Sequence, residues 1–233
     1  THIWGDLDAP YMNFESGPRM ASCDNFRIEV EGKSAHGSTP HQGVDAILAA
    51  AHIITEIQAV VSRMNDPLNP LVITVGTING GQRFNILADK VVMEGTTRTH
   101  SPKMRQETEP LLRRIVENAA DSMGAKATLT FEYFPAPIIN DHEDLVRIAR
   151  NAATKMYGTD SLKPFPKMMI SEDFAYYMEK VPGVFGLVGS QNKDLGLTAK
   201  NHNDHYTADE SVLKRGAAMY AQFAYDFLEE TSG

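Results

Sequence analysis

The chain has 233 residues, enough for one large domain or two modest ones, and with 42% apolar and 22% charged residues it has the composition of an ordinary globular protein. No apolar run approaches the ~18 residues that a membrane span needs, and a net charge of −8 with interspersed acidic and basic residues argues against nucleic acid or an anionic membrane as a partner. The single cysteine, Cys23, cannot form an internal disulfide, so the cytoplasm is the expected location.

The first 20 residues predict a strand followed by an irregular connecting arm, because Pro10, Gly17 and Pro18 break any helix. The chain opens inside this strand without an initiator methionine, and we therefore expect that the parent protein has an upstream piece. Apolar spacing then predicts, in order, a strand from residue 25, a helix over 44–64, strands over 71–79 and 89–99, a helix from Ser101 to Gly124 and a strand over 126–134. This order is that of a compact split βαβ (ferredoxin-like) α+β sandwich.

The last part of the chain predicts a second, α/β block. Its expected elements are a helix capped by Asn140 and ending at Gly158, strands over 167–170 and 184–189, and helices over 172–179 and 209–230. A capping box at residues 207–210 opens the last helix, whose expected buried stripe is Leu213, Ala217, Tyr220, Ala224 and Phe227. We therefore predict a discontinuous outer domain, residues 1–20 and 135–233, with residues 21–134 inserted into it.

A glycine-rich loop with two histidines, His36 and His41, follows the first strand of the inserted domain. Its glycines and Pro40 shape the backbone tightly, which is typical of a loop that presents an imidazole to something outside its own domain. An ordinary strand-to-helix connection with two surface histidines explains the local spacing equally well.

Further histidines suit a metal site: His2 at a strand end, and His202 with His205 in a polar loop before the last helix. Imidazole is the commonest metal ligand, and ligands in α/β sheets usually lie on loops at strand ends. The chain contains no HExxH, CxxC or GxSxG motif, so spacing alone leaves incidental histidines as the alternative.

Four stretches together carry a family resemblance: GKSAHGSTPHQGVDAI from residue 32, INGGQRFNILADKVVMEGTTRT from 78, SEDFAYY from 171 and NHNDHYTADESVLKRGAA from 201. In this combination and order the chain resembles the amidohydrolase branch of the co-catalytic metallopeptidases, which includes aminoacylases, hippurate hydrolases, indoleacetyl-amino-acid hydrolases and some carboxypeptidases. The resemblance implies an α/β catalytic domain with two divalent metal ions (zinc, manganese, nickel or cobalt) and an inserted lid and dimerisation domain. It also implies a homodimer that forms through this lid.

The same resemblance assigns roles to five residues. His2 and His202 occupy positions of metal ligands, and His36 matches a loop histidine that reaches the partner's active site and stabilises the developing oxyanion. Asn85 and Arg98 match residues that help to hold substrate. Arg98 also offers a bidentate fork for a carboxylate, although an arginine on a sheet edge is often structural.

The family takes its other ligands (a cysteine, a histidine and an acidic residue) and its glutamate base from sequence upstream of His2. Cys23 lies too late in the chain to be the ligand cysteine, and Glu172 is expected to cap a helix rather than to replace the base.

In this chemistry two ions polarise the amide carbonyl and activate a bridging water, and a carboxylate moves its proton to the leaving amine. We therefore expect a metal-dependent amidohydrolase acting on N-acyl amino acids or small dipeptide-like amides, with this chain alone incomplete as a catalyst. The alternatives are a noncatalytic dimerisation or ligand-binding module and a globular protein whose histidines are incidental.

Overall fold

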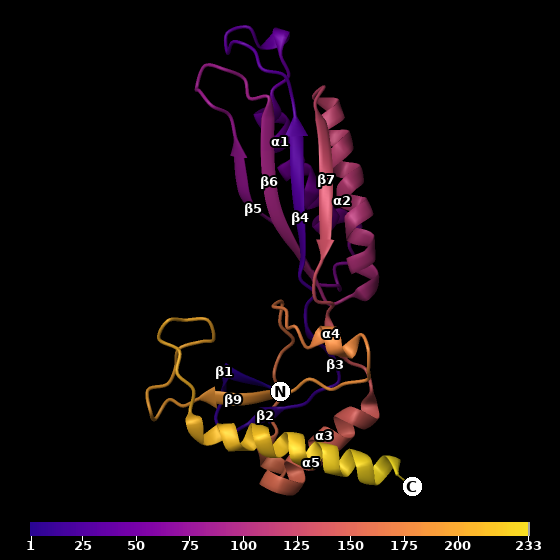
Figure 1. Cartoon of the computed structure of the whole chain (residues 1–233), viewed down its shortest axis with the longest axis vertical. Coiled ribbons are helices and arrows are strands. Elements are labelled where there is room, and N and C mark those ends of the chain that lie inside the picture. Colours follow the sequence, from indigo (N-terminus) through magenta and orange to yellow (C-terminus); the bar gives the residue numbers. More distant parts are fainter. Residues whose placement is uncertain (233) are drawn as a thin grey trace. The chain divides into compact units, whose positions relative to one another are not determined.

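A computed structural model describes residues 1–232 as two compact units (Figure 1). The inserted unit comprises residues 20–137 and 169–175, and the outer unit comprises residues 1–19, 138–168 and the segment from 176 onward. Each unit has a hydrophobic core of its own, as expected of a domain.

The inserted unit is built on a four-stranded antiparallel sheet with the spatial order β5-β6-β4-β7. The strands are β4 (Asp24–Glu31), β5 (Leu71–Gly80), β6 (Lys90–Thr99) and β7 (Lys126–Tyr133). In β4, Phe26, Ile28 and Val30 are buried because alternate side chains face the helices, while Arg27 and Glu31 are exposed. This element order and pairing confirm the predicted split βαβ sandwich.

Two helices cover one face of this sheet (Figure 1): α1 (Ala46–Ala59), which a π-helical turn extends to Met64, and α2 (Pro102–Ser122). Ser101 caps α2 as predicted, since its hydroxyl accepts a hydrogen bond from the backbone N–H of Met104. The helix continues through Pro110, and Gly124 follows it with a φ of 72°. Residues 46–64 are the one helical stretch of residues 1–232 whose length and composition would suit a membrane span, but one of its sides packs in the core of this unit.

The outer unit contains a three-stranded sheet in which β9 (Leu187–Gln191) lies between β1 (His2–Asp8) and β2 (Met12–Asn13). β1 is parallel to β9, and β2 is antiparallel to it. A second, two-stranded sheet joins β3 (Gly17–Met20) to β8 (Ile138–Asn140). The strand predicted at the start of the chain is therefore present, whereas β2 and β3 lie in the segment predicted to be irregular.

Two long helices of the outer unit, α3 (Glu143–Tyr157) and α5 (Leu213–Thr231), contact each other, and α4 (Ala175–Met178) is a single turn. Short 3-10 turns occupy residues 40–42, 159–161 and 210–212. The core of this unit is formed mainly by residues of the strands and of α3. The last helix contributes only Met219 and the partly buried Phe223, and the turn before it contributes Val212.

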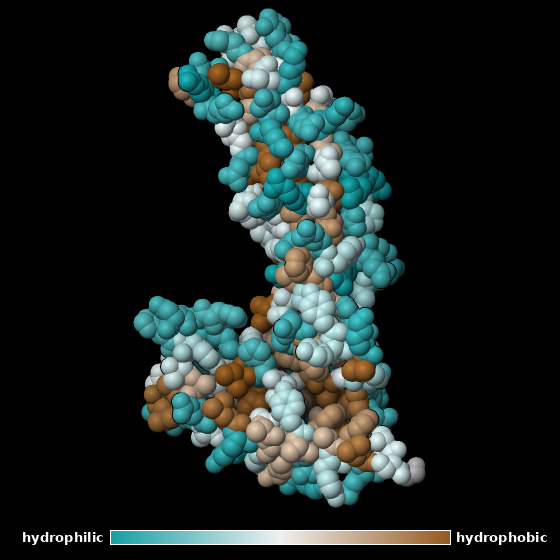
Figure 2. Space-filling model, in the orientation of Figure 1, coloured by the Kyte–Doolittle hydropathy of each residue, from teal (hydrophilic) through white to brown (hydrophobic). Residues whose placement is uncertain are grey.

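The predicted buried stripe of α5 is wrong. Leu213 and Tyr220 are 51% and 61% exposed, and Ala217 and Ala224 are exposed as well. The helix carries apolar side chains on more than one face, and periodicity alone does not say which face packs against the rest of a unit. Figure 2 shows the resulting apolar surface on the outer unit.

Three other predictions in the outer unit are wrong or imprecise. Asn140 ends β8 instead of capping a helix: its buried amide donates to the carbonyls of Glu15 and Phe185, and His142 precedes α3. Residues 167–170 form no strand, the predicted strand at 184–189 is β9 shifted toward the C-terminus, and the predicted helix over 172–179 shrinks to α4. Asp209, not a Thr207 capping box, caps the turn before α5, because its carboxylate accepts from the backbone N–H of Ser211.

Candidate functional site

His2 lies at the first position of β1, where a backbone carbonyl fixes its ring. Its Nδ1 lies 2.5 Å from the carbonyl oxygen of Ile3, and since that oxygen can only accept, Nδ1 must carry the proton. The lone pair of the neutral ring is then on Nε2. This is the arrangement in which a histidine binds a metal, with its other nitrogen donating to a carbonyl.

Asn201 joins the loop that carries His202 to the same strand. Its amide nitrogen donates to the carbonyl oxygen of Ile3 at 3.2 Å, and its amide oxygen accepts from the backbone N–H of Gly5 at 2.6 Å. The His2 ring and the residue directly before His202 therefore meet at one carbonyl oxygen. Residues from the two ends of the chain form a single corner of the outer unit.

Gly5 permits this close approach. A Cβ atom at this position would lie 2.9 Å from the Tyr206 ring, 3.1 Å from the carbonyl oxygen of Ala199 and 3.1 Å from the amide oxygen of Asn201. The loop from 199 to 206 thus packs directly against the backbone of β1. Tyr206 anchors the end of the loop, with its hydroxyl 2.8 Å from the Ser190 hydroxyl on β9.

His202 has a φ of 64° and is the only non-glycine residue with positive φ among residues 1–232. This left-handed conformation costs an L-residue roughly 1–2 kcal/mol, and such strain concentrates at binding and catalytic sites. His205 is exposed and lies 3.8 Å from the exposed carboxylate of Asp204.

This corner could supply part of a metal site but not a complete set of ligands. The imidazole of His2 suits a borderline divalent ion, because its hydrogen bond to the Ile3 carbonyl leaves Nε2 available as a donor atom, and His202 lies in the loop that is hydrogen bonded to the same strand. Within residues 1–232, no group of three or more histidine, cysteine, aspartate or glutamate side chains lies close enough together to hold an ion. The Glu172 carboxylate accepts a hydrogen bond from the backbone N–H of Phe174 at 3.0 Å, just before α4.

His36 and Asn85 lie together in the inserted unit, although they are far apart in the sequence. The backbone N–H of Gly37 donates to the Asn85 carbonyl at 2.8 Å, and that of Leu87 donates to the Ala35 carbonyl at 2.9 Å. A Cβ atom on Gly37 would lie 3.1 Å from the Asn85 carbonyl oxygen, so glycine allows the two loops to touch. Both side chains are exposed.

Ser38 determines which nitrogen of His36 carries the proton. The backbone N–H of Ser38 donates to Nδ1 of His36 at 3.1 Å, and the Ser38 hydroxyl lies 2.7 Å from the same atom. Because the N–H can only donate, Nδ1 is the acceptor and the neutral ring carries its proton on Nε2. The loop thus presents an exposed Nε2–H, which is the group needed to hydrogen bond an oxyanion.

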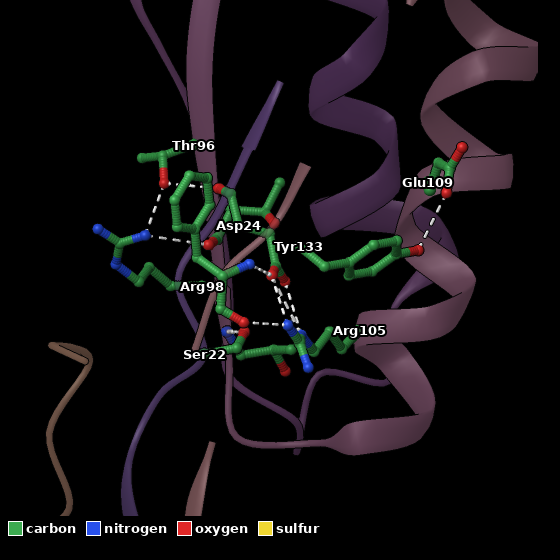
Figure 3. A network of polar contacts seen from close by, with 10 residues as sticks. Ser22, Asp24, Thr96, Arg98, Arg105, Glu109 and Tyr133 are labelled. Atoms are coloured by element: carbon green, nitrogen blue, oxygen red, sulfur yellow. Dashed lines mark hydrogen bonds and ion pairs between the residues drawn. The ribbon is translucent and has the colours of Figure 1, made fainter. Parts of the chain in front are cut away.

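Arg98 belongs to a polar network at the other end of the same sheet (Figure 3). Its Nη1 donates to the hydroxyl of Thr96 at 2.6 Å and to the carbonyl of Thr97 at 3.2 Å. The Thr96 hydroxyl donates in turn to the backbone carbonyl of Asp24 at 2.8 Å. Arg98 makes no ion pair with an acidic side chain of residues 1–232, so its charge is available to a substrate carboxylate.

The network is anchored by the buried carboxylate of Asp24. Arg105 donates to it in a bidentate fashion, with Nε at 2.9 Å from Oδ2 and Nη2 at 2.8 Å from Oδ1, and the backbone N–H of Phe134 donates to Oδ1 at 3.1 Å. Asp24 is 1% exposed, and all of its close contacts in Figure 3 belong to the inserted unit. The Asp24–Arg105 ion pair therefore fixes the first residue of β4, whose carbonyl accepts the hydrogen bond from Thr96.

One inserted unit cannot bring His36 and Arg98 to the same small molecule. Lys90, at the start of β6, pairs with Glu31 beside the His36 loop, whereas Arg98 lies eight residues further along the strand. At ~3.4 Å per residue this separates the two ends by about 27 Å. The structure thus brings together His36 with Asn85, and His2 with the His202 loop, but not Arg98 with His36.

Four residues of these sites were not identified from the sequence. Ser38 and Asn201 lie inside the quoted motifs, next to the histidines they support, but nothing in the residue pattern shows which backbone atoms their side chains meet. Thr96 lies inside a quoted motif two residues from Arg98, but it also bonds to Asp24 on another strand, and Gly5 packs against a distant loop. Such long-range contacts leave no local signal.

Comparisons with known proteins find similarity over the inserted unit and over nearly the whole chain. Residues 23–124 match the family model described as a peptidase dimerisation domain. The chain is 33% identical over 228 residues to an N-acetyl-L-cysteine deacetylase of Bacillus subtilis, covering 98% of this chain and 53% of that protein. It is 32% identical over 234 residues to the IAA-amino acid hydrolase ILR1-like 4 of Arabidopsis thaliana, with 98% and 53% covered.

Among solved structures, a dinuclear metal binding peptidase from the M20 family of Bacillus subtilis superposes with a TM-score of 0.79 at 28% identity. The superposition covers 98% of this chain and 56% of that protein. The chain therefore spans about half the length of the relatives it matches.

Proposed function

We propose, from the membership of this chain in the M20 family of amidohydrolases and peptidases, that its parent protein is a metal-dependent amidohydrolase that cleaves the amide bond of N-acyl amino acids or similar small amides. The observation that carries the proposal is the corner where the His2 ring and the Asn201 amide share the Ile3 carbonyl. The corner supports the proposal because the His2 ring keeps one nitrogen free to bind an ion, and the loop that carries His202 is hydrogen bonded to the same strand.

In the proposed reaction His2 and His202 would each serve as a ligand of a dinuclear metal centre, whose other ligands would come from outside this chain. When bound, such ions polarise the amide carbonyl and lower the pKa of a water molecule toward neutrality. His36 donates its Nε2–H to the oxygen of the tetrahedral intermediate, a contact that contributes roughly 3 kcal/mol at comparable sites. Asn85 binds the same end of the substrate, and Arg98 pairs with the carboxylate of the amino acid.

We propose that the protein is a homodimer formed through the inserted unit. β5 is an edge strand with Val72 and Ile78 exposed, and α1 exposes Ile47 and Leu48, so a sheet edge and a helix face are both open to a second copy. The separation of His36 and Arg98 supports this assembly, because two copies can supply the two residues to one substrate while a single copy cannot.

The exposed apolar stripe of α5 supports the expectation that this chain alone is incomplete as a catalyst. Leu213, Tyr220 and Leu228 are all more than half exposed, and the relatives are nearly twice as long as the matched region. Further protein packed on this stripe would account for its apolar character. We further propose a cytoplasmic location, in keeping with the free Cys23 thiol.

The test of the proposed function is turnover of N-acetyl amino acids by the full-length natural protein loaded with zinc or manganese. We expect His36→Ala to lower kcat by about 100- to 1,000-fold with unchanged metal content, and His41→Ala, in the same loop, to leave both unchanged. Full activity of the His36→Ala variant would remove this residue from the mechanism. The intact mass of the natural product tests the alternative of a noncatalytic module: a polypeptide of 25.7 kDa would favour the module.

A further inference from the structure

Phe84 is the most exposed large apolar residue among residues 1–232, with a relative exposure of 104%. It lies in the loop between β5 and β6, in a turn closed by a hydrogen bond from the backbone N–H of Ile86 to the carbonyl of Arg83. Phe84 and Asn85 are the two central residues of this turn. Removing apolar surface from water is favourable, so the phenyl ring is stabilised by any apolar group that covers it.

The position of Phe84 relative to His36 is set by backbone contacts. The Asn85 carbonyl accepts from Gly37, directly after His36, and the Leu87 carbonyl accepts from the Ser34 hydroxyl at 3.1 Å. Phe84 therefore belongs to the turn whose backbone is hydrogen bonded to the His36 loop, directly before Asn85. A ring that served only the core of this unit would point inward, and this one makes no such contact.

We propose that Phe84 is a specificity-determining residue that packs against an apolar acyl group of the substrate; this inference rests on the proposed function. An N-acyl amino acid has a carboxylate, an amide and an acyl group. Arg98, at the far end of the sheet, suits the carboxylate, and His36 with Asn85 suits the amide. The apolar ring beside the amide-binding pair is then available to the acyl group, and the preferred substrates carry aromatic or longer aliphatic acyl groups instead of acetyl.

The test uses the metal-loaded full-length protein and two substrate series. One series varies the acyl group (acetyl, hexanoyl, benzoyl) on one amino acid, and the other varies the amino acid under a constant benzoyl group. We expect Phe84→Ala to lower kcat/KM for the benzoyl and hexanoyl substrates by about 10- to 100-fold and to change the acetyl value by less than about twofold. Phe84→Leu should fall between Phe84→Ala and wild type.

Leu68→Ala is the matched control, because Leu68 is 86% exposed and lies in the loop before β5, at the end of the inserted unit away from His36. Equal losses for all acyl groups, a preference that follows the amino acid, or no change at all would overturn the inference. So would dissociation of the dimer by Phe84→Ala, which would assign the ring to a protein interface. If the wild-type protein hydrolyses none of these amides, the proposed function is wrong, and the inference about Phe84, which depends on it, is wrong as well.

Discussion

Replacing Gly5 by alanine is expected to disrupt the His2–His202 corner without touching either histidine. The new methyl group would lie 2.9 Å from the Tyr206 ring and 3.1 Å from two oxygen atoms, those of the Ala199 carbonyl and the Asn201 amide. These distances are shorter than ordinary carbon contacts, so the loop must move away from β1. Its movement stretches the 2.6 Å hydrogen bond between the Gly5 N–H and Asn201.

The expected magnitudes follow from overpacking and from lost support of a ligand. An added methyl group in a tightly packed site costs about 1–3 kcal/mol of stability. Displacing a group that orients a metal ligand typically lowers metal affinity by about 10- to 100-fold. Because Asn201 directly precedes His202, we expect both effects in the same variant.

Two measurements on the full-length protein test this prediction: the free energy of unfolding by denaturant titration, and metal affinity by competition with a chelator. Gly216→Ala serves as the control, since the nearest atom to its Cβ is 4.0 Å away and an alanine in α5 should stabilise the helix by up to ~1 kcal/mol. A Gly5→Ala variant that loses stability but keeps wild-type metal affinity would separate this loop from the metal site. Unchanged stability would refute the close approach itself.

Three further predictions concern the inserted and outer units. Thr96→Val removes the hydroxyl that holds Arg98 and should raise KM for carboxylate-bearing substrates several-fold while kcat changes less; an equal effect on a substrate amide without a carboxylate would contradict this role. Asp24→Asn removes the ion pair of the largely buried Arg105 and should cost about 3–5 kcal/mol in denaturant unfolding, whereas Glu94→Gln, in an exposed ion pair, should cost less than about 1 kcal/mol. Burial raises the pKa of Glu15, but hydrogen bonds from Asn13 and the Phe165 N–H and the nearby arginines outweigh it and hold the pKa below its ordinary 4.5. The stability that Glu15 contributes is therefore present above pH 4.5 and lost as the pH falls through the lowered pKa, so Glu15→Gln should flatten the acid limb of a stability-against-pH curve.

The fold of the inserted unit was predictable from sequence because local and tertiary signals agree there. Alternation in β4 identifies its buried face, and Ser101 with Pro102 marks the start of α2. Each element of this unit also finds its partners within about 110 residues of the same chain. No part of its core depends on sequence elsewhere.

The outer unit was harder to predict for a physical reason. Its strands are short, and α5 buries a face other than the one its apolar periodicity favours. Asn140 has the residue type of a helix cap but uses its amide to bind two distant carbonyls. Where long-range contacts determine the conformation and burial of a residue, the local sequence pattern predicts them poorly.

The site was predictable only in part. The resemblance pointed to His2, His36 and His202, but no spacing rule indicates that Asn201 and the His2 ring share one carbonyl. The proton position on His36 likewise depends on a hydrogen bond from Ser38, which only three-dimensional geometry reveals. The distance between Arg98 and His36 follows from the register of β4 and β6, which motif matching does not predict.

The central proposal is a homodimer in which His36 of one copy acts at the metal centre of the other. It is tested most directly by mixing two inactive full-length variants, His36→Ala and His202→Ala, and measuring amide hydrolysis after subunit exchange. We expect recovery of roughly a quarter of wild-type activity, because about half of the re-formed dimers are mixed and each mixed dimer has one intact site. A mixture that stays inactive, although mass analysis shows mixed dimers, would contradict the claim.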